Sequence, residues 1–431
     1  MRRIHSDPLA VLFAAAALPN GIAVADETAS APLAAALDVA RHLREKPPSP
    51  GSLDLYSGAP GRLYFFLEAW KAGADPENLA AARALADELV AGIDRAATAR
   101  ELGLYTGIAG VGAALLEAHR VTGDKAYADG VRRVVAALEK RAAKHHGDGA
   151  RWNFTTDVIS GTAGIGLFLL EAARALDLPA ARDLAERAGK SLLGSAEKSP
   201  AGLEWAMQPF APYDMPNFSH GTAGIAYFLA TLYGETNPRR AEFLDAAIAG
   251  ANHLLAIANQ DDGGLVVHHY KANGNTGGFL LGWCHGPPGT ARLFERLALV
   301  TGDPSWKTWM LRGARSVVDR GEKSKHLWDN SSLCCGTAGV GDFFLDLYRS
   351  TGDATWLDHA RTLAKDILSR GRRDASGLAW AAPSRTAHPG EPADAIGLMQ
   401  GSPGIGLFLL RLDAAEKKRE PAVRLPDTPF R

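Results

Sequence analysis

Seven helical stretches of the chain are rich in apolar and small residues, and each follows a Gly-x-x-Gly turn. Residues 165–170 and 405–410 both read Ile-Gly-Leu-Phe-Leu-Leu. A helix that is apolar on nearly every face is buried on all sides, so the pattern predicts seven inner helices. The turns begin at Gly58, Gly107, Gly161, Gly221, Gly286, Gly336 and Gly401.

Amphipathic helices, with charge on one face only, are expected between these stretches. Three of them open with the same Thr-Gly-Asp sequence. Its glycine is expected to end the preceding helix in a left-handed conformation, and its aspartate to cap the next helix. Residues 32–46 make a first outer helix, and other examples are residues 125–140, 240–256 and 356–369.

An inner apolar helix that alternates with an outer half-polar one predicts an all-α fold. Seven such pairs make a double-layered (α/α)7 toroid, with an open solenoid of helix hairpins as the alternative. Strand-like pieces at residues 264–270 and 377–380 are expected to be small β-hairpin insertions in loops. We expect one seven-repeat domain at residues 32–415, a C-terminal tail at residues 416–431, and an N-terminal extension at residues 1–31.

The amino-acid composition and the net charge exclude some classes of function. With 431 residues, 46% hydrophobic and 22% charged, the chain has the composition of a globular protein with a large core. A net charge of −1 provides no field suited to nucleic acid or to an anionic membrane surface. No apolar run is long enough to span a bilayer, so we expect no integral membrane segment.

The N-terminal 25 residues fit a secretory signal in part. Arg2 and Arg3 precede an apolar run, and Ala23-Val-Ala25 resembles a cleavage site, but Asp7 interrupts the basic region. We expect a cytoplasmic protein, where thiols stay reduced, with export as the alternative if residues 1–25 are a signal peptide.

The chain has three cysteines, and all lie immediately before Gly-x-x-Gly turns. Three cysteines cannot form a disulfide framework, which favours a metal-binding or reactive role. Equivalent positions in a closed ring face the same end of its axis. We therefore expect Cys284, Cys334 and Cys335 to cluster at one mouth of the toroid, beside His285 and His220.

Three thiolates with an open fourth position make a catalytic zinc site. The alternatives are a structural zinc with His285 as fourth ligand, a strained Cys334–Cys335 disulfide, and buried cysteines that act only as small hydrophobes. His220 beside a turn has the alternative of hydrogen-bonding backbone only. His268 and His269, in a strand-like loop, are expected on the surface and not as ligands.

At these motifs the sequence resembles the lanthionine synthetase C-like family of cyclases. The resemblance covers residues 32–415 and rests on the seven turns together with Ser219-His220-Gly221, Trp283-Cys284-His285-Gly286 and Cys334-Cys335-Gly336. It implies a toroid of seven helical hairpins with one zinc ion at a mouth. The implied reaction is Michael-type addition of a cysteine thiol to dehydroalanine or dehydrobutyrine, which closes a thioether ring in a peptide.

Carried over by position, Cys284 and Cys334 match the family's two zinc-binding cysteines. His220 matches its histidine acid/base, and Asp157 matches an acidic residue of the active site. Cys335 stands where most members have a histidine ligand, and Leu280 stands where cyclases often have arginine. His285 replaces a tyrosine or asparagine and is included in the predicted catalytic set with His220 and Asp157.

Four hypotheses follow for the function. The first is a cyclase that acts on a dehydrated precursor peptide supplied by a separate dehydratase. The second keeps the chemistry but adds glutathione or another small thiol to dehydroamino acids in proteins. The third is an unrelated zinc toroid such as a prenyltransferase subunit, whose mixed ligand spacing is not matched here. The fourth is a non-catalytic toroid that binds a peptide.

Overall fold

The computed structural model describes residues 29–46, 52–208, 214–272, 275–321, 330–381 and 395–428. The candidate signal segment at residues 1–25 lies outside these ranges. Within them, no helix is both long and apolar enough to cross a membrane.

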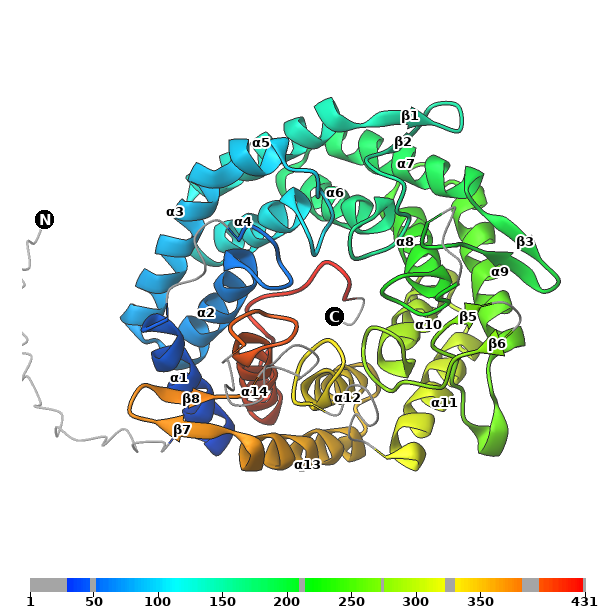
Figure 1. Ribbon diagram of the computed structural model, residues 1–431. Coiled ribbons are helices and arrows are strands. Elements are labelled where there is room, and N and C mark those ends of the chain that lie inside the picture. Colours follow the sequence, from blue (N-terminus) through cyan, green and yellow to red (C-terminus); the bar gives the residue numbers. More distant parts are fainter. Residues whose placement is uncertain are drawn as a thin grey trace, which may run out of the picture.

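Fourteen α-helices in the described residues form two concentric layers around a central axis (Figure 1). The inner layer consists of α2 (Ala59–Gly73), α4 (Ile108–Thr122), α6 (Thr162–Leu176), α8 (Thr222–Glu235), α10 (Pro287–Thr301), α12 (Thr337–Thr351) and α14 (Ser402–Glu416). The outer layer consists of α1 (Ala31–Arg44), α3 (Pro76–Thr98), α5 (Lys125–Arg141), α7 (Pro179–Gly194), α9 (Ala241–Ile257), α11 (Ser305–Arg320) and α13 (Ala354–Arg370). Because α14 packs against both α1 and α2, the ring is closed, which confirms the toroid and excludes the solenoid.

Four small antiparallel hairpins lie in the described parts of the loops, as expected for an all-α fold with insertions. They are β1 (Ala143–His145) with β2 (Gly149–Arg151), β3 (Glu197–Ser199) with β4 (Gly202–Glu204), β5 (Lys271–Ala272) with β6 (Asn275–Thr276), and β7 (Arg372–Asp374) with β8 (Gly377–Ala379). The predicted strand at residues 377–380 is β8. The one at residues 264–270 is wrong in its bounds: its hairpin begins at Lys271. The hydroxyl of Ser316 accepts the N–H of Leu265, so α11 holds the start of this segment.

The Thr-Gly-Asp sequences end one helix and cap the next, as predicted. At residues 122–124, Gly123 has a φ of 75° and the Asp124 carboxylate accepts the N–H of Ala126 at 3.0 Å. At residues 351–353, Gly352 has a φ of 72° and Asp353 caps α13 in the same way. A side-chain acceptor at this position satisfies one of the free amides of the first helical turn.

The Gly-x-x-Gly turns need glycine because loop backbone occupies the place of a side chain. A Cβ at Gly289 would overlap the carbonyl oxygen of Trp283, and one at Gly110 would overlap the carbonyl oxygen of Leu104. In both turns the obstructing carbonyl belongs to the residue six positions earlier. The motif therefore folds each loop tightly over the N-terminus of its inner helix.

The inner helices carry more charge than their apolar pattern predicts. Arg411 binds Asp346 at 2.8 Å and also pairs with Asp342, while Arg292 lies 3.9 Å from Asp346. All four side chains are buried. Buried ions of this kind must be paired, and here α10, α12 and α14 supply both signs.

Candidate metal centre and active site

A ring of backbone hydrogen bonds organises one mouth of the toroid. Its members, which we call the mouth ring, are the residues two positions before each turn glycine: Tyr56, Tyr105, Ile159, Ser219, Cys284, Cys334 and Met399. Six of the seven neighbouring pairs are joined by an N–H to carbonyl bond of 2.8–3.2 Å. At the remaining pair, Ile159 and Ser219, the side chains of Asp157 and His220 make the connection.

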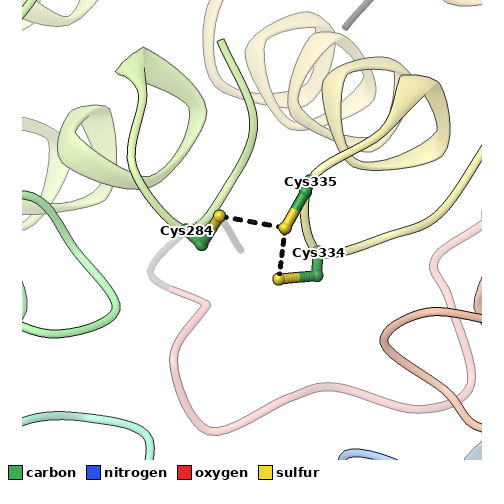
Figure 2. A group of neighbouring side chains, drawn as sticks. All are labelled: Cys284, Cys334 and Cys335. Atoms are coloured by element: carbon green, nitrogen blue, oxygen red, sulfur yellow. Dashed lines mark hydrogen bonds between the residues drawn. The ribbon is translucent and has the colours of Figure 1, made fainter. Parts of the chain in front are cut away.

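The mouth ring brings the three cysteines together. The N–H of Cys284 donates to the carbonyl of Cys334 at 3.2 Å, which places the two residues side by side. The sulfur of Cys335 lies 3.1 Å from that of Cys284 and 2.9 Å from that of Cys334 (Figure 2). The three side chains are 3–5% exposed, and no disulfide joins them. The predicted cluster of thiols is present.

The donor set fits a zinc ion. Tetrahedral zinc binds thiolate at about 2.3 Å, which separates neighbouring sulfurs by about 3.8 Å. The three sulfurs all lie within 4.8 Å of one another, and no nitrogen of His285 belongs to that group in the described ranges. A metal bound at this cluster would take its protein ligands from the three cysteines and not from His285.

Two further side chains reach the sulfurs. The amide of Gln400 donates to the hydroxyl of Tyr56 at 2.6 Å and lies 3.7 Å from the sulfur of Cys335. The neighbouring hydroxyl of Tyr56 contributes to lowering the pKa of the Cys334 thiol. Burial and the neighbouring thiols raise the pKa of Tyr56, so its phenol keeps the proton that it shares with the sulfur. Sequence reasoning aligned both residues with the cysteines but did not assign them to the site.

The thiols do not share negative charge equally. Hydrogen bonds from Cys284 and Cys335 lower the pKa of the Cys334 thiol well below its usual range. The bond to Cys334 raises the pKa of Cys284. Negative charge therefore gathers first on Cys334, the sulfur that also interacts with Tyr56 and His220.

His220 is bound to a buried carboxylate at the edge of the cluster. Its Nδ1 lies 2.6 Å from Oδ2 of Asp157, while Oδ1 of Asp157 accepts the N–H of Ser160 at 2.8 Å. Burial alone lowers the pKa of His220, but the hydrogen bond and charge of Asp157, together with Cys334, raise it overall. The pair resembles those in which a carboxylate orients an acid/base imidazole.

His285 is buried beside His220 and is held neutral. The two ring centroids are 5.6 Å apart, and the ring of His269 lies 4.2 Å from that of His285 on another side. Burial lowers the pKa of His285 well below its usual range, with the two histidines adding to the effect. Its Nδ1 is buried without a hydrogen-bond partner, and an unsatisfied polar atom at a site is open to a ligand.

The expectation that His268 and His269 lie on the surface was wrong for His268, which is buried, while His269 is half-buried. His268 is 8% exposed, and its carbonyl accepts the side-chain amide of Asn217 at 2.8 Å. His269 packs on His285. A bridge between Val266 and Asn259 fastens the start of this loop. The turn alignment covers only the residues beside the glycines, so it could not locate this loop.

Comparison with known proteins gives the same architecture. Residues 49–425 match the family model described as lanthionine synthetase C-like protein. The structure of a nisin cyclase aligns with a TM-score of 0.64 at 16% identity, covering 89% of this chain and 93% of that one. A family GH76 α-mannanase from Bacteroides thetaiotaomicron aligns with a TM-score of 0.51 at 13% identity, covering 77% and 95%. These identities show a shared fold alone. Since the family model spans most of its length, the chain belongs to the lanthionine synthetase C-like family.

Proposed function

We propose that this protein is a zinc-dependent cyclase that adds a cysteine thiol to dehydroalanine or dehydrobutyrine in a modified precursor peptide. The observation that carries the proposal is the meeting of three buried thiols with the His220–Asp157 pair at one mouth of the family's fold. A cluster of thiols alone, or a histidine–carboxylate pair alone, would also fit other functions. Together they supply the two requirements of the reaction, an activated sulfur and a proton donor.

Cys284, Cys334 and Cys335 are the proposed ligands of one zinc ion per chain. Zinc at this site would lower the pKa of a substrate thiol bound at the open position, so that it attacks as thiolate. Tyr56 and Gln400 orient the sulfurs through the hydrogen bonds described above. Partners of this kind hold ligands in place and tune their basicity.

His220 is the proposed acid/base. When the thiolate sulfur bonds to the β-carbon, the electron pair of the double bond moves toward the carbonyl, and the α-carbon takes a proton. Because Nδ1 of His220 is bound to Asp157, Nε2 is the nitrogen that faces substrate. The raised pKa of His220 favours the protonated form that delivers this proton.

Asp157 is the proposed positioning residue for His220, and His285 the proposed substrate contact. Asp157 is fully buried and holds the imidazole in one orientation. His285 is neutral and has a free buried Nδ1, so it is suited to hydrogen-bond a carbonyl oxygen or amide of the peptide. The substrate requires earlier dehydration of serine or threonine, which we assign to a separate dehydratase. We propose a cytoplasmic location, where thiols stay reduced.

The test combines zinc content with a thioether assay. Anaerobically purified protein is expected to hold about one zinc per chain, and Cys284→Ala, Cys334→Ala and Cys335→Ala to lose it. The substrate is a peptide with one dehydroalanine and one cysteine, and ring closure is followed as loss of free thiol without change of mass. Met399→Leu, in the next position of the mouth ring, is the matched control. Zinc-free parent protein would contradict the metal site, and zinc without ring closure would leave a binding toroid.

Addition of glutathione to dehydroalanine in proteins is the second candidate. Leu280, at the position where the family's cyclases often have arginine, is buried and contributes no charge for binding a peptide. The same assay distinguishes the two functions. Glutathione adduct formation on a dehydroalanine-containing protein, without ring closure in the peptide, would favour this candidate over the first.

A further inference from the structure

Residues 417–428, which we call the axial segment, run into the centre of the ring (Figure 1). The segment leaves α14 at its C-terminal end, whereas the thiols precede the N-terminal ends of α10 and α12. It therefore enters the axis from the end opposite to the mouth. The N–H groups of Val423 and Arg424 donate to carboxylates of Glu68 and Glu117 at 2.8 and 2.9 Å, in the C-terminal halves of α2 and α4.

Further along the segment, Asp427 is fully buried beneath the mouth ring. The hydroxyl of Tyr105 donates to its Oδ1 at 3.1 Å, and the indole N–H of Trp283 donates to its Oδ2 at 3.0 Å. The guanidinium of Arg292 lies 3.6 Å from Oδ2. A buried carboxylate is costly unless it is paired and hydrogen-bonded, and these three partners meet that need.

Both hydrogen-bond donors are connected to the three cysteines through the mouth ring. Tyr105 is a member of the mouth ring, and Trp283 directly precedes Cys284. The ring of Trp283 packs against those of Tyr105 and Phe218, with centroids 5.3 and 5.8 Å apart. Burial, together with Asp427, raises the pKa of Tyr105 well above its usual range, so the phenol remains a donor.

Little free space remains around this contact. The cavity that Trp283, Tyr105 and Leu425 line has a volume of about 10 Å³, which holds one water molecule at most. A turn of the indole would break its hydrogen bond to Asp427. A shift of Trp283 would be passed to the backbone of Cys284, the next residue.

We propose that Asp427 is a positioning residue for the metal site, which holds Trp283 and Tyr105 from within the axis and so fixes Cys284 against Cys334 and Cys335. The inference rests on the proposed function, since it takes the three thiols as metal ligands. It assigns a role to a segment that contributes no ligand. Without the carboxylate, the indole and phenol lose their acceptor, and Trp283 keeps only its ring contacts with Tyr105 and Phe218 to orient it.

The experiment measures Co²⁺ binding to the full chain and to Asp427→Asn, which keeps the shape of the side chain but not its charge. Affinity is measured by chelator competition, and the thiolate-to-cobalt charge-transfer band reports the geometry of the sulfurs. We expect Asp427→Asn to weaken Co²⁺ binding about 10- to 100-fold and to shift the band. Trp283→Phe, which removes the indole donor together with part of the ring, is expected to act in the same direction.

Asp413→Asn is the matched control. Asp413 is equally buried and bonds Ser30 and Arg419 at 2.6 and 3.1 Å, but it lies near the C-terminal end of α14, away from the thiols. It is expected to lower the melting temperature while leaving Co²⁺ affinity within about twofold of the parent. Parent-like Co²⁺ binding by Asp427→Asn and Trp283→Phe would overturn the assignment. An absence of Co²⁺ binding in the parent would overturn the proposed metal site, and the assignment with it.

Discussion

The turns before α4 and α10 have the same backbone and different chemistry. In both, the mouth-ring residue donates its N–H to the neighbouring turn, and the first glycine, Gly107 or Gly286, is extended with a φ of −159° or −138°. One turn presents Tyr105 and Thr106, and the other presents Cys284 and His285. The fold constrains the glycines and leaves the two preceding positions free. The side chains at these two positions can therefore differ between turns without a change of architecture.

The largest effect is expected from His220→Ala compared with Thr106→Ala. The two residues hold the same place in their turns, directly before the first glycine. Loss of the proposed acid/base should reduce ring closure about 10²- to 10⁴-fold, because proton transfer to carbon then depends on water. Thr106→Ala should stay within about threefold of the parent. Equal losses in the two variants would show that the position matters structurally and not chemically.

Substitution of the glycines tests the backbone conformation that the two turns share. Gly110→Ala and Gly289→Ala should each destabilise the protein by about 2–4 kcal/mol, since a Cβ would overlap a loop carbonyl in either turn. Urea unfolding measures both. Gly278→Ala, where no atom lies within 4 Å of the added Cβ, should change stability by no more than about 0.5 kcal/mol. A large difference between Gly110 and Gly289 would break the equivalence of the turns.

Tyr56→Phe tests the hydrogen bonds around the sulfurs. Loss of the hydroxyl removes the donor to Cys334 and the acceptor of Gln400, which should weaken zinc binding about 10- to 100-fold. Tyr64→Phe is the control, because the hydroxyl of Tyr64 is buried in α2 without a hydrogen-bond partner. Chelator competition on both variants makes the measurement. Unchanged affinity in Tyr56→Phe would remove that residue from the site.

The pH dependence of His220 follows from its pair with Asp157. Because Asp157 raises the pKa of His220 above its ordinary value in the folded state, the pair stabilises the fold below the unfolded value of about 6.5. That contribution disappears as pH rises through the raised pKa. Asp157→Asn should lower the pKa, which an NMR titration of the His220 imidazole would record. Titration at the parent's pH would contradict the assigned pair.

The smallest effect is expected in the outer layer. Asp124→Ala and Asp353→Ala each remove a helix cap and should cost about 1 kcal/mol, with zinc content unchanged. Calorimetry with parallel metal analysis checks both. Loss of zinc in either variant would show that outer helices influence the mouth.

The fold could be predicted from the sequence because its signals are local and repeated. Glycines recur where loops cross helix ends, and apolar stretches follow them. The thiol cluster followed from the same repeat, since Cys284 and Cys334 hold equivalent positions. The roles of His220 and Asp157 came from family resemblance, because no local pattern links residues 63 positions apart.

Other parts of the site could not be predicted from local pattern. His269 reaches His285 from a loop that lies outside the aligned turns. The charges at the axis, such as Arg411 and Asp346, are minority residues in helices that are otherwise apolar. The contacts of Asp427 join residues as far apart as 322 positions, and a sequence pattern does not record such pairings.

The closure of the ring has a consequence for folding. Its ends are joined by contacts such as Ser30 with Asp413, 383 positions apart, and Glu68 with Val423, 355 positions apart. Contacts of long sequence separation form late, since the chain must first lose the entropy of a very large loop. During synthesis, the apolar faces of α1 and α2 that pack against α14 therefore stay exposed until the chain up to residue 423 has left the ribosome. A chain truncated before α14 would leave the ring unclosed, with apolar helix faces exposed at both ends. Such faces would favour association with another copy of the chain.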